Sequence, residues 1–129
     1  MKKFLLLLCL VWGVEQAKAQ SSCDIQTYKE ICIRKIPEYF VFTKSYALTQ
    51  RESEHEIIFN GSNAYIFIAD SYRTVIEVYR QGTDGEKILI KSGKAYLSYI
   101  PSNTGKYYVR FVFEDTDEFC GAAVMCFLR

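Results

Sequence analysis

The sequence has little of several residues on which enzyme chemistry often depends: one histidine, one tryptophan, two methionines and two prolines among 129 residues. No Cys-x-x-Cys pair is present, which argues against a redox-active dithiol and against a short zinc knuckle. The Gly-x-Ser-x-Gly elbow of the α/β-hydrolases is also missing. A single histidine, His55, offers no second neutral ligand for a catalytic zinc ion. We therefore do not expect an enzyme, and no catalytic residue is assigned.

Neither sign of charge is in excess, with 16 basic and 15 acidic residues. A surface that binds nucleic acid needs clustered Lys and Arg to displace counterions from phosphates, and no such cluster is present. No stretch resembles the basic amphipathic helix of a membrane-surface protein. The sequence thus predicts neither a nucleic-acid partner nor membrane insertion, and it does not indicate an oligomeric state.

The longest apolar run, residues 4–12, is shorter than the about 20 residues that a membrane-spanning helix needs. It follows Lys2 and Lys3 and is followed by Ala17 and Ala19, small residues at the −3 and −1 positions of a signal peptidase site. We expect residues 1–19 to be a signal peptide and residues 20–129 to be one exported domain, periplasmic or secreted. Removal of the four charged residues of this segment leaves 13 basic and 14 acidic residues.

The mature chain retains four cysteines: Cys23, Cys32, Cys120 and Cys126. An even number of cysteines in an exported chain predicts disulfides. In an extended strand the Cα atoms of Cys120 and Cys126 would stand about 20 Å apart. On a helix those of Cys23 and Cys32 would be about 14 Å apart, whereas a disulfide needs about 7 Å. We therefore expect two disulfides that join the two ends of the chain, with their pairing left open.

Hydrophobic periodicity indicates one helix followed by strands. In residues 22–36, Ser22 and Asp24 are plausible N-caps and apolar residues recur at helical spacing, so we expect a helix that ends before Pro37. From residue 39 onward the period changes to two, as in strands. The expected strands are 39–48, 55–59, 63–70, 74–81, 87–92, 94–100, 106–114 and 123–128.

Turn signals separate these strands. Asn60-Gly61 is typical of a type I′ hairpin turn, which predicts that the strands on either side of it pair with each other. A second turn is expected at Thr83-Asp84-Gly85, and residues 49–54 are expected to form a polar loop. About eight short strands at this spacing indicate a mainly β protein: a single antiparallel β-sandwich, jelly-roll-like, with one short N-terminal helix.

The segments IEVYRQGTDGEKIL (76–89) and IPSNTGKYYVRFVFE (100–114) resemble the bacterial pre-peptidase C-terminal type of β-sandwich. The chain is also similar to uncharacterised small exported proteins of Bacteroidota-type bacteria at KSYAL (44–48), TGKYY (104–108) and CGAAVMCF (120–127). The chain differs from the pre-peptidase type in its cysteines and in having no attached protease. These resemblances imply export and a β-sandwich fold, and they imply no catalytic residue.

Ten tyrosines are the most unusual feature of the composition. Tyrosine combines an apolar ring with a polar end, so it suits recognition surfaces as well as sheet faces. By strand alternation Tyr79, Tyr96, Tyr108 and Arg110 should all point outward. We expect them to form a Tyr-rich sheet face that binds a protein or a glycan. The alternative is that these side chains only stabilise the sheet by cross-strand pairing.

Four carboxylates, Glu114, Asp115, Asp117 and Glu118, lie in one predicted loop. Ca²⁺ takes carboxylate oxygens as ligands, and the loops of β-sandwiches often supply them. One alternative is therefore a Ca²⁺-dependent carbohydrate-binding domain, with Ca²⁺ as the only candidate cofactor. The other interpretation of these residues is a solvated acidic turn.

The only histidine, His55, lies between Glu54 and Glu56. Carboxylates can orient an imidazole, so a small hydrolase with His55 as its base is a third hypothesis. Consecutive strand residues alternate faces, however, so the two glutamates would not share the side on which His55 lies. We therefore expect His55 to be part of a solvated, charged loop that enters a strand.

Overall fold

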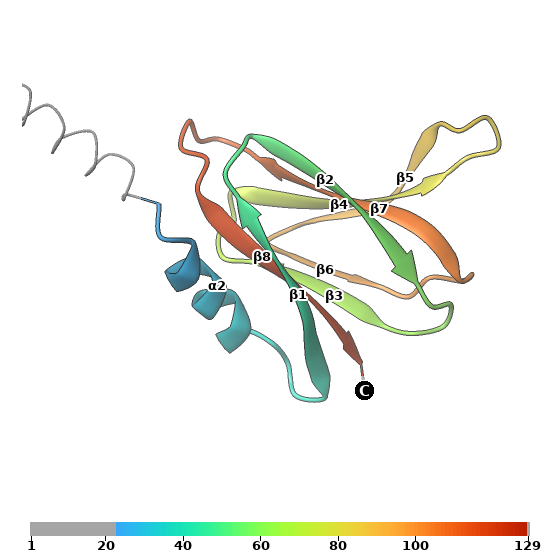
Figure 1. The fold of residues 1–129 in the computed structure, drawn as a ribbon, viewed down its shortest axis with the longest axis horizontal. Coiled ribbons are helices and arrows are strands. Elements are labelled where there is room, and N and C mark those ends of the chain that lie inside the picture. Colours follow the sequence, from blue (N-terminus) through green and yellow to red (C-terminus); the bar gives the residue numbers. More distant parts are fainter. Residues whose placement is uncertain (1–22, 129) are drawn as a thin grey trace, which may run out of the picture.

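The computed structural model describes residues 23–128 (Figure 1). It has one helix, α2 (Ile25–Arg34), and eight strands: β1 (Phe40–Leu48), β2 (Glu52–Phe59), β3 (Tyr65–Ala69), β4 (Thr74–Gln81), β5 (Lys87–Lys94), β6 (Tyr96–Tyr99), β7 (Gly105–Phe113) and β8 (Gly121–Leu128). The predicted signal peptide, residues 1–19, lies outside the described residues. Within residues 23–128 no helix combines the length and apolar character needed to cross a membrane.

The strands form two four-stranded antiparallel sheets. Sheet A has the order β1-β8-β3-β6, and sheet B has the order β2-β7-β4-β5. Two Greek keys give this strand order, which is that of a jelly roll. The predicted fold class is therefore confirmed: a mainly β, jelly-roll-like sandwich with one N-terminal helix.

The core between the sheets follows from the two-residue period of the strands. In β7 the side chains of Tyr107, Val109, Phe111 and Phe113 are buried, while the residues between them are more exposed. Strand β4 shows the same alternation. Because successive strand residues point to opposite faces, each sheet contributes one apolar face to this core.

Sheet A is covered on its outer face as well. Helix α2 packs over β8 and β1, as Figure 1 shows. The helix buries a second small cluster whose members face away from the main core: Cys32, Ile66, Ile68, Ala122, Val124 and Cys126. Strands β3 and β8 are thus buried on both faces, which explains their almost unbroken apolar sequences.

Helix α2 is shorter than the predicted range 22–36. Asp24 is its N-cap, and one carboxylate oxygen accepts a hydrogen bond from the Thr27 backbone N–H at 3.2 Å. The helix ends at Arg34, and Lys35 is its C-cap. Its end thus comes before Pro37, as expected, but two residues earlier than the apolar spacing suggested.

The predicted hairpin at Asn60-Gly61 is wrong. Strand β2 pairs with β7 in sheet B, whereas β3 pairs with β6 and β8 in sheet A, so residues 60–64 carry the chain from one sheet to the other. Gly61 is needed for another reason: a Cβ atom there would lie 2.9 Å from the Thr104 backbone nitrogen. Local turn chemistry specifies that the chain reverses, but it does not specify which strands then pair.

The turn at residues 83–85 is a true hairpin between β4 and β5. The Gly82 N–H donates to the Glu86 carbonyl at 2.6 Å, and Gly85 has a positive φ of 82°. The predicted loop 49–54 is only partly a loop, because β2 already begins at Glu52. In β2 the charged residues Glu52, Glu54 and Glu56 alternate with less exposed residues. This alternation suits β2, which is an edge strand of sheet B.

Candidate functional site

The outer face of sheet B carries three of the four residues predicted to bind a partner. Tyr79 on β4 lies directly opposite Tyr108 on β7, and Arg110 is two residues further along β7 on the same side. In Figure 1 helix α2 lies against sheet A, and no described element covers this side of sheet B. We call this surface the sheet B face; it includes Glu52, Glu54, Glu56, Ile58, Val75, Glu77, Tyr79, Lys87, Leu89, Lys106, Tyr108, Arg110 and Val112.

Charged groups surround the two tyrosines. Arg110 pairs with Glu52 at 2.8 Å and lies 3.6 Å from Glu77. The Tyr79 hydroxyl donates to Glu77 Oε1 at 3.0 Å, and burial together with this hydrogen bond raises the pKa of Tyr79. Lys87 pairs with Glu54, and its ammonium lies 4.5 Å from the centre of the Tyr108 ring. The face is therefore a polar surface with two partly exposed aromatic rings.

Tyr96 does not belong to this face, so the predicted four-residue set is wrong on that point. Tyr96 points outward as expected and is exposed, but it lies on β6 of sheet A, opposite Ile68 of β3. Strand alternation fixes whether a side chain points in or out of the sandwich. It does not fix to which sheet a strand belongs.

The acidic loop does not bring its four carboxylates together. Glu114 pairs with Lys94 at 3.5 Å, whereas Glu118 lines a cavity at the other end of the loop. Asp115, Asp117 and Glu118 line a second groove together with two arginines, Arg51 and Arg73. Among residues 23–128 no group of three acidic, histidine or cysteine side chains is placed to hold a metal ion.

One of the two predicted disulfides is present. Cys23 and Cys120 are bonded, with 5.6 Å between their Cα atoms, so the two ends of the chain are joined as expected. The second disulfide is absent: Cys32 and Cys126 are both buried, free thiols. The Cys32 thiol donates to the Ala122 carbonyl at 3.3 Å, and Ala122 precedes Cys126 by four residues, which is about 13 Å of extended strand.

Burial makes both free thiols poor nucleophiles. It raises the pKa of Cys32 to about 12 and that of Cys126 to about 11. Because the thiolate is the reactive form of cysteine, neither residue is suited to catalysis.

His55 is not in a solvated loop, contrary to the prediction. It points inward from β2, and its ring centre lies 4.6 Å from that of Tyr46 and 5.9 Å from that of Phe111. Its Nε2 atom is buried and has no hydrogen-bond partner among the described residues. A ring that packs against two aromatic side chains is poorly placed to act as the base of a hydrolase.

The position of His55 predicts a pH effect on stability. Burial, and secondarily the positive charge of Lys44, lowers the pKa of His55 in the folded protein. The unfolded chain therefore binds the proton more readily. Stability should fall as the pH drops from about 6.5, the ordinary histidine pKa, towards the lowered pKa of the folded state.

We expect His55→Phe, which keeps an aromatic ring beside Tyr46 and Phe111, to remove this part of the pH dependence. The measurement is urea unfolding of both proteins at pH 7.5 and pH 5. Asp70, whose pKa burial raises, contributes equally to both proteins and cancels in the comparison. An equal loss of unfolding free energy in both proteins would contradict the prediction.

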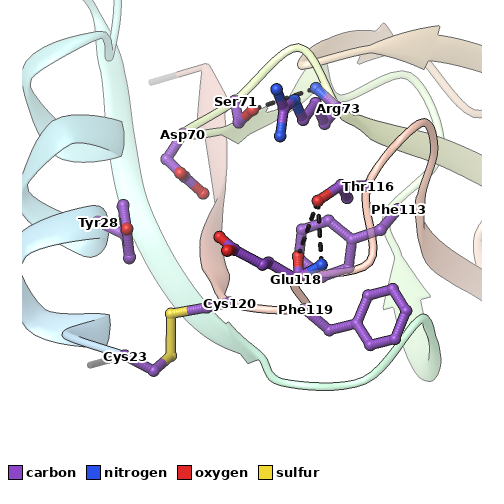
Figure 2. Close-up of a pocket in the computed structure, with 10 residues that line it drawn as sticks. All are labelled: Cys23, Tyr28, Asp70, Ser71, Arg73, Phe113, Thr116, Glu118, Phe119 and Cys120. Atoms are coloured by element: carbon purple, nitrogen blue, oxygen red, sulfur yellow. Dashed lines mark hydrogen bonds between the residues drawn. A yellow bond between two sulfur atoms is a disulfide. The ribbon is translucent and has the colours of Figure 1, made fainter. Parts of the chain in front are cut away.

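A cavity of about 610 Å³ lies beside the disulfide, and its main residues were missed in the sequence. Tyr28 comes from α2, Asp70 and Arg73 from the connection between β3 and β4, and Glu118 from the loop between β7 and β8 (Figure 2). Of these four, sequence reasoning singled out only Glu118. Residues so distant in sequence meet only in the folded chain, and no local motif marks Asp70 or Arg73.

The chain matches no known protein-family model, and no curated protein is found to be similar to it. The resemblance to the pre-peptidase C-terminal type stays a prediction.

Proposed function

We propose that the protein is an exported, non-catalytic binding module that recognises a glycan through the sheet B face. The observation that carries this proposal is the directly opposed pair of Tyr79 and Tyr108, partly exposed and surrounded by charged side chains. The C–H faces of sugar rings are apolar and stack on aromatic rings, while sugar hydroxyls exchange hydrogen bonds with charged groups. This face offers both kinds of contact on one surface.

Ion pairs on the face favour a polar ligand. Lys106 pairs with Glu56 at 2.9 Å, and Arg110 is held between Glu52 and Glu77. Such pairs at an exposed surface add little to stability, since solvent screens them. They do hold donors and acceptors in fixed positions beside the two rings, which is what recognition of sugar hydroxyls requires.

A protein partner is the second candidate, because two large aliphatic side chains are exposed on the same face. Ile58 is 65% exposed and Leu89 is 50% exposed. Aliphatic and aromatic side chains together can form the anchor of a protein interface. Leu89 of β5 lies directly opposite Tyr79 and so extends the tyrosine pair, whereas Ile58 of β2 lies opposite the charged Lys106.

Export is supported by the Cys23–Cys120 disulfide, since disulfides persist in oxidising compartments. The periplasm and the extracellular space both fit this observation.

The test is a glycan-array screen followed by calorimetry on each glycan that binds. We expect the double change Tyr79→Ser with Tyr108→Ser to weaken binding at least about tenfold, because both stacking rings are removed. Tyr96→Ser is the matched control: it removes an exposed tyrosine from the other sheet and should leave the affinity unchanged.

Two results would count against the glycan site. One is equal affinity of the double variant and the unchanged protein. The other is an equal loss of affinity in the Tyr96→Ser control, which would show that binding does not depend on the sheet B face. If an identified protein partner binds and the tyrosine pair is required, the second candidate is supported instead.

A further inference from the structure

The cavity beside the disulfide is a separate place in the fold from the sheet B face. Its walls come from helix α2, from residues 70–73 and from residues 113–120 (Figure 2). The Cys23–Cys120 bond ties the start of the helix segment to the loop before β8, so it fixes two of these walls relative to each other. A volume of about 610 Å³ is within the range of ligand pockets, about 300–1,000 Å³.

Asp70 is held in place from several sides. Its Oδ1 accepts a hydrogen bond from the Ala122 N–H at 2.8 Å, and its own N–H donates to the Ala122 carbonyl at 3.1 Å. Lys35 Nζ donates to the Asp70 backbone carbonyl at 3.3 Å. Figure 2 shows the carboxylate pointing into the cavity. Burial raises the pKa of Asp70, as is common for carboxylates at ligand sites.

Gly121 provides the space that the Asp70 carboxylate occupies. A Cβ atom at position 121 would lie only 2.7 Å from Asp70 Oδ1 and 3.4 Å from the Phe113 ring. Any other residue would push the carboxylate away from its hydrogen bond to Ala122. The cavity thus contains a carboxylate whose position depends on a glycine in the next strand.

The other charged groups of the cavity have opposite signs. Glu118 also lines it, and Figure 2 shows its carboxylate directed inward from the loop between β7 and β8. The Arg73 side chain lines the side away from the disulfide. Arg73 also lines the groove that contains Asp115 and Asp117, but it forms no ion pair within the described part of the chain, so its guanidinium can pair with an anionic group.

Aromatic rings complete the walls. Phe113 and Phe119 pack against each other with 5.8 Å between ring centres, and Tyr28 faces the cavity from helix α2. A ligand with only negative charge would meet two carboxylates, and a purely apolar one would offer no group of opposite charge to Asp70, Glu118 or Arg73. Both kinds of ligand are disfavoured by the cost of desolvating unpaired polar groups.

We propose that this cavity binds a small zwitterion of amino-acid or dipeptide size. Its ammonium group lies between Asp70 and Glu118, its carboxylate pairs with Arg73, and its apolar part rests on Phe113 and Phe119. This ligand satisfies both signs of charge and the aromatic wall at once. The proposal does not depend on glycan binding by the sheet B face.

Four related probes test the proposal by calorimetry on the protein with its disulfide intact. Leucine and leucyl-leucine carry both charges at two different spacings, leucinamide carries only the ammonium, and N-acetylleucine carries only the carboxylate. We expect saturable binding of one of the two zwitterions, weaker binding of leucinamide and no binding of N-acetylleucine. The zwitterion that binds more tightly identifies the ligand size.

Three variants assign the contacts. Asp70→Asn keeps an oxygen for the Ala122 N–H but loses the charge, and should weaken both the zwitterion and leucinamide roughly tenfold or more. Arg73→Gln should weaken the zwitterion by a similar factor and leave leucinamide unaffected. Glu114→Gln is the control in the same loop, because Glu114 pairs with Lys94 outside the cavity.

The proposal is overturned if neither zwitterion binds saturably, or if Asp70→Asn binds as tightly as the unchanged protein while it remains folded. It is also overturned if leucinamide binds as tightly as the zwitterion, since Arg73 would then have no role. The double change Tyr79→Ser with Tyr108→Ser should not affect zwitterion binding. A failure of the glycan site is therefore distinguishable from a failure of this one.

Discussion

Replacement of both Cys23 and Cys120 by alanine is expected to lower the free energy of unfolding by about 4 kcal/mol and the melting temperature by roughly 20 °C. The two cysteines are 97 residues apart in sequence, so their bond closes a loop that includes almost all of the described chain. In the chain-entropy model, a longer loop removes more conformations from the unfolded state and stabilises the folded state more. Thermal unfolding followed by circular dichroism measures the change.

Reduction supplies the control. Dithiothreitol should lower the melting temperature of the unchanged protein to that of the double variant, and it should have no effect on the double variant. Peptide mapping under non-reducing conditions should find the Cys23–Cys120 bond, with Cys32 and Cys126 alkylated only after unfolding. A shift of only a few degrees on reduction would contradict the prediction, because the disulfide would then not constrain the unfolded chain as described.

Phe59→Ala should cost about 3–5 kcal/mol of stability, the range observed for large aromatic residues removed from well-packed cores. Phe59 is fully buried at the end of β2. Its ring centre is 4.4 Å from that of Tyr65 and 5.1 Å from that of Tyr107. Because Tyr65 belongs to sheet A and Tyr107 to sheet B, the Phe59 ring connects the two sheets, and a cavity there loosens contacts on both sides.

Ile58→Ala is the matched control for Phe59→Ala, since Ile58 is the preceding residue on the same strand but is mostly exposed. Its replacement should change stability by no more than about 0.5 kcal/mol. Urea unfolding of both variants gives the comparison. A loss below about 1 kcal/mol for Phe59→Ala would mean that the neighbouring rings close the cavity, and the proposed connection between the sheets would be wrong.

Strand alternation and turn residues were sufficient to predict the fold class. Residues such as Tyr107, Val109 and Phe111 alternate with polar ones in the sequence, and that pattern directly reflects one buried sheet face. The pairing of strands was harder to predict. Asn60-Gly61 has the composition of a hairpin turn, yet it connects two sheets, because pairing depends on contacts between segments far apart in sequence.

The same distinction explains which site residues were found. Tyr79, Tyr108 and Arg110 share a face because they belong to neighbouring strands of sheet B and have the same parity. Tyr96 has an outward parity too, but its strand lies in sheet A. The residues of the cavity form no periodic pattern in the sequence. Asp70 is oriented by Ala122, 52 residues away, and by the absence of a side chain at Gly121.

The cysteines illustrate the limits of distance arguments. Chain geometry excluded pairing within each end, and the bond between Cys23 and Cys120 agrees with that reasoning. Chain geometry alone could not show that helix α2 would place Cys32 beside Ala122, at the beginning of β8. That placement depends on how α2 packs on sheet A, which is a property of the whole fold.

The position of β8 has a consequence for how the protein is made. This eighth strand lies inside sheet A, hydrogen-bonded to β1 on one side and to β3 on the other. A polypeptide that emerges from a ribosome or a translocation channel in N-to-C order exposes β1 and β3 before their shared neighbour has been released. Until residues 121–128 arrive, β1 has no partner in its sheet and β3 has only β6, so unpaired strand edges remain open to association with other chains. Sheet A therefore closes only after release of nearly the whole described chain, and the protein cannot complete its fold while its last strand is still being released.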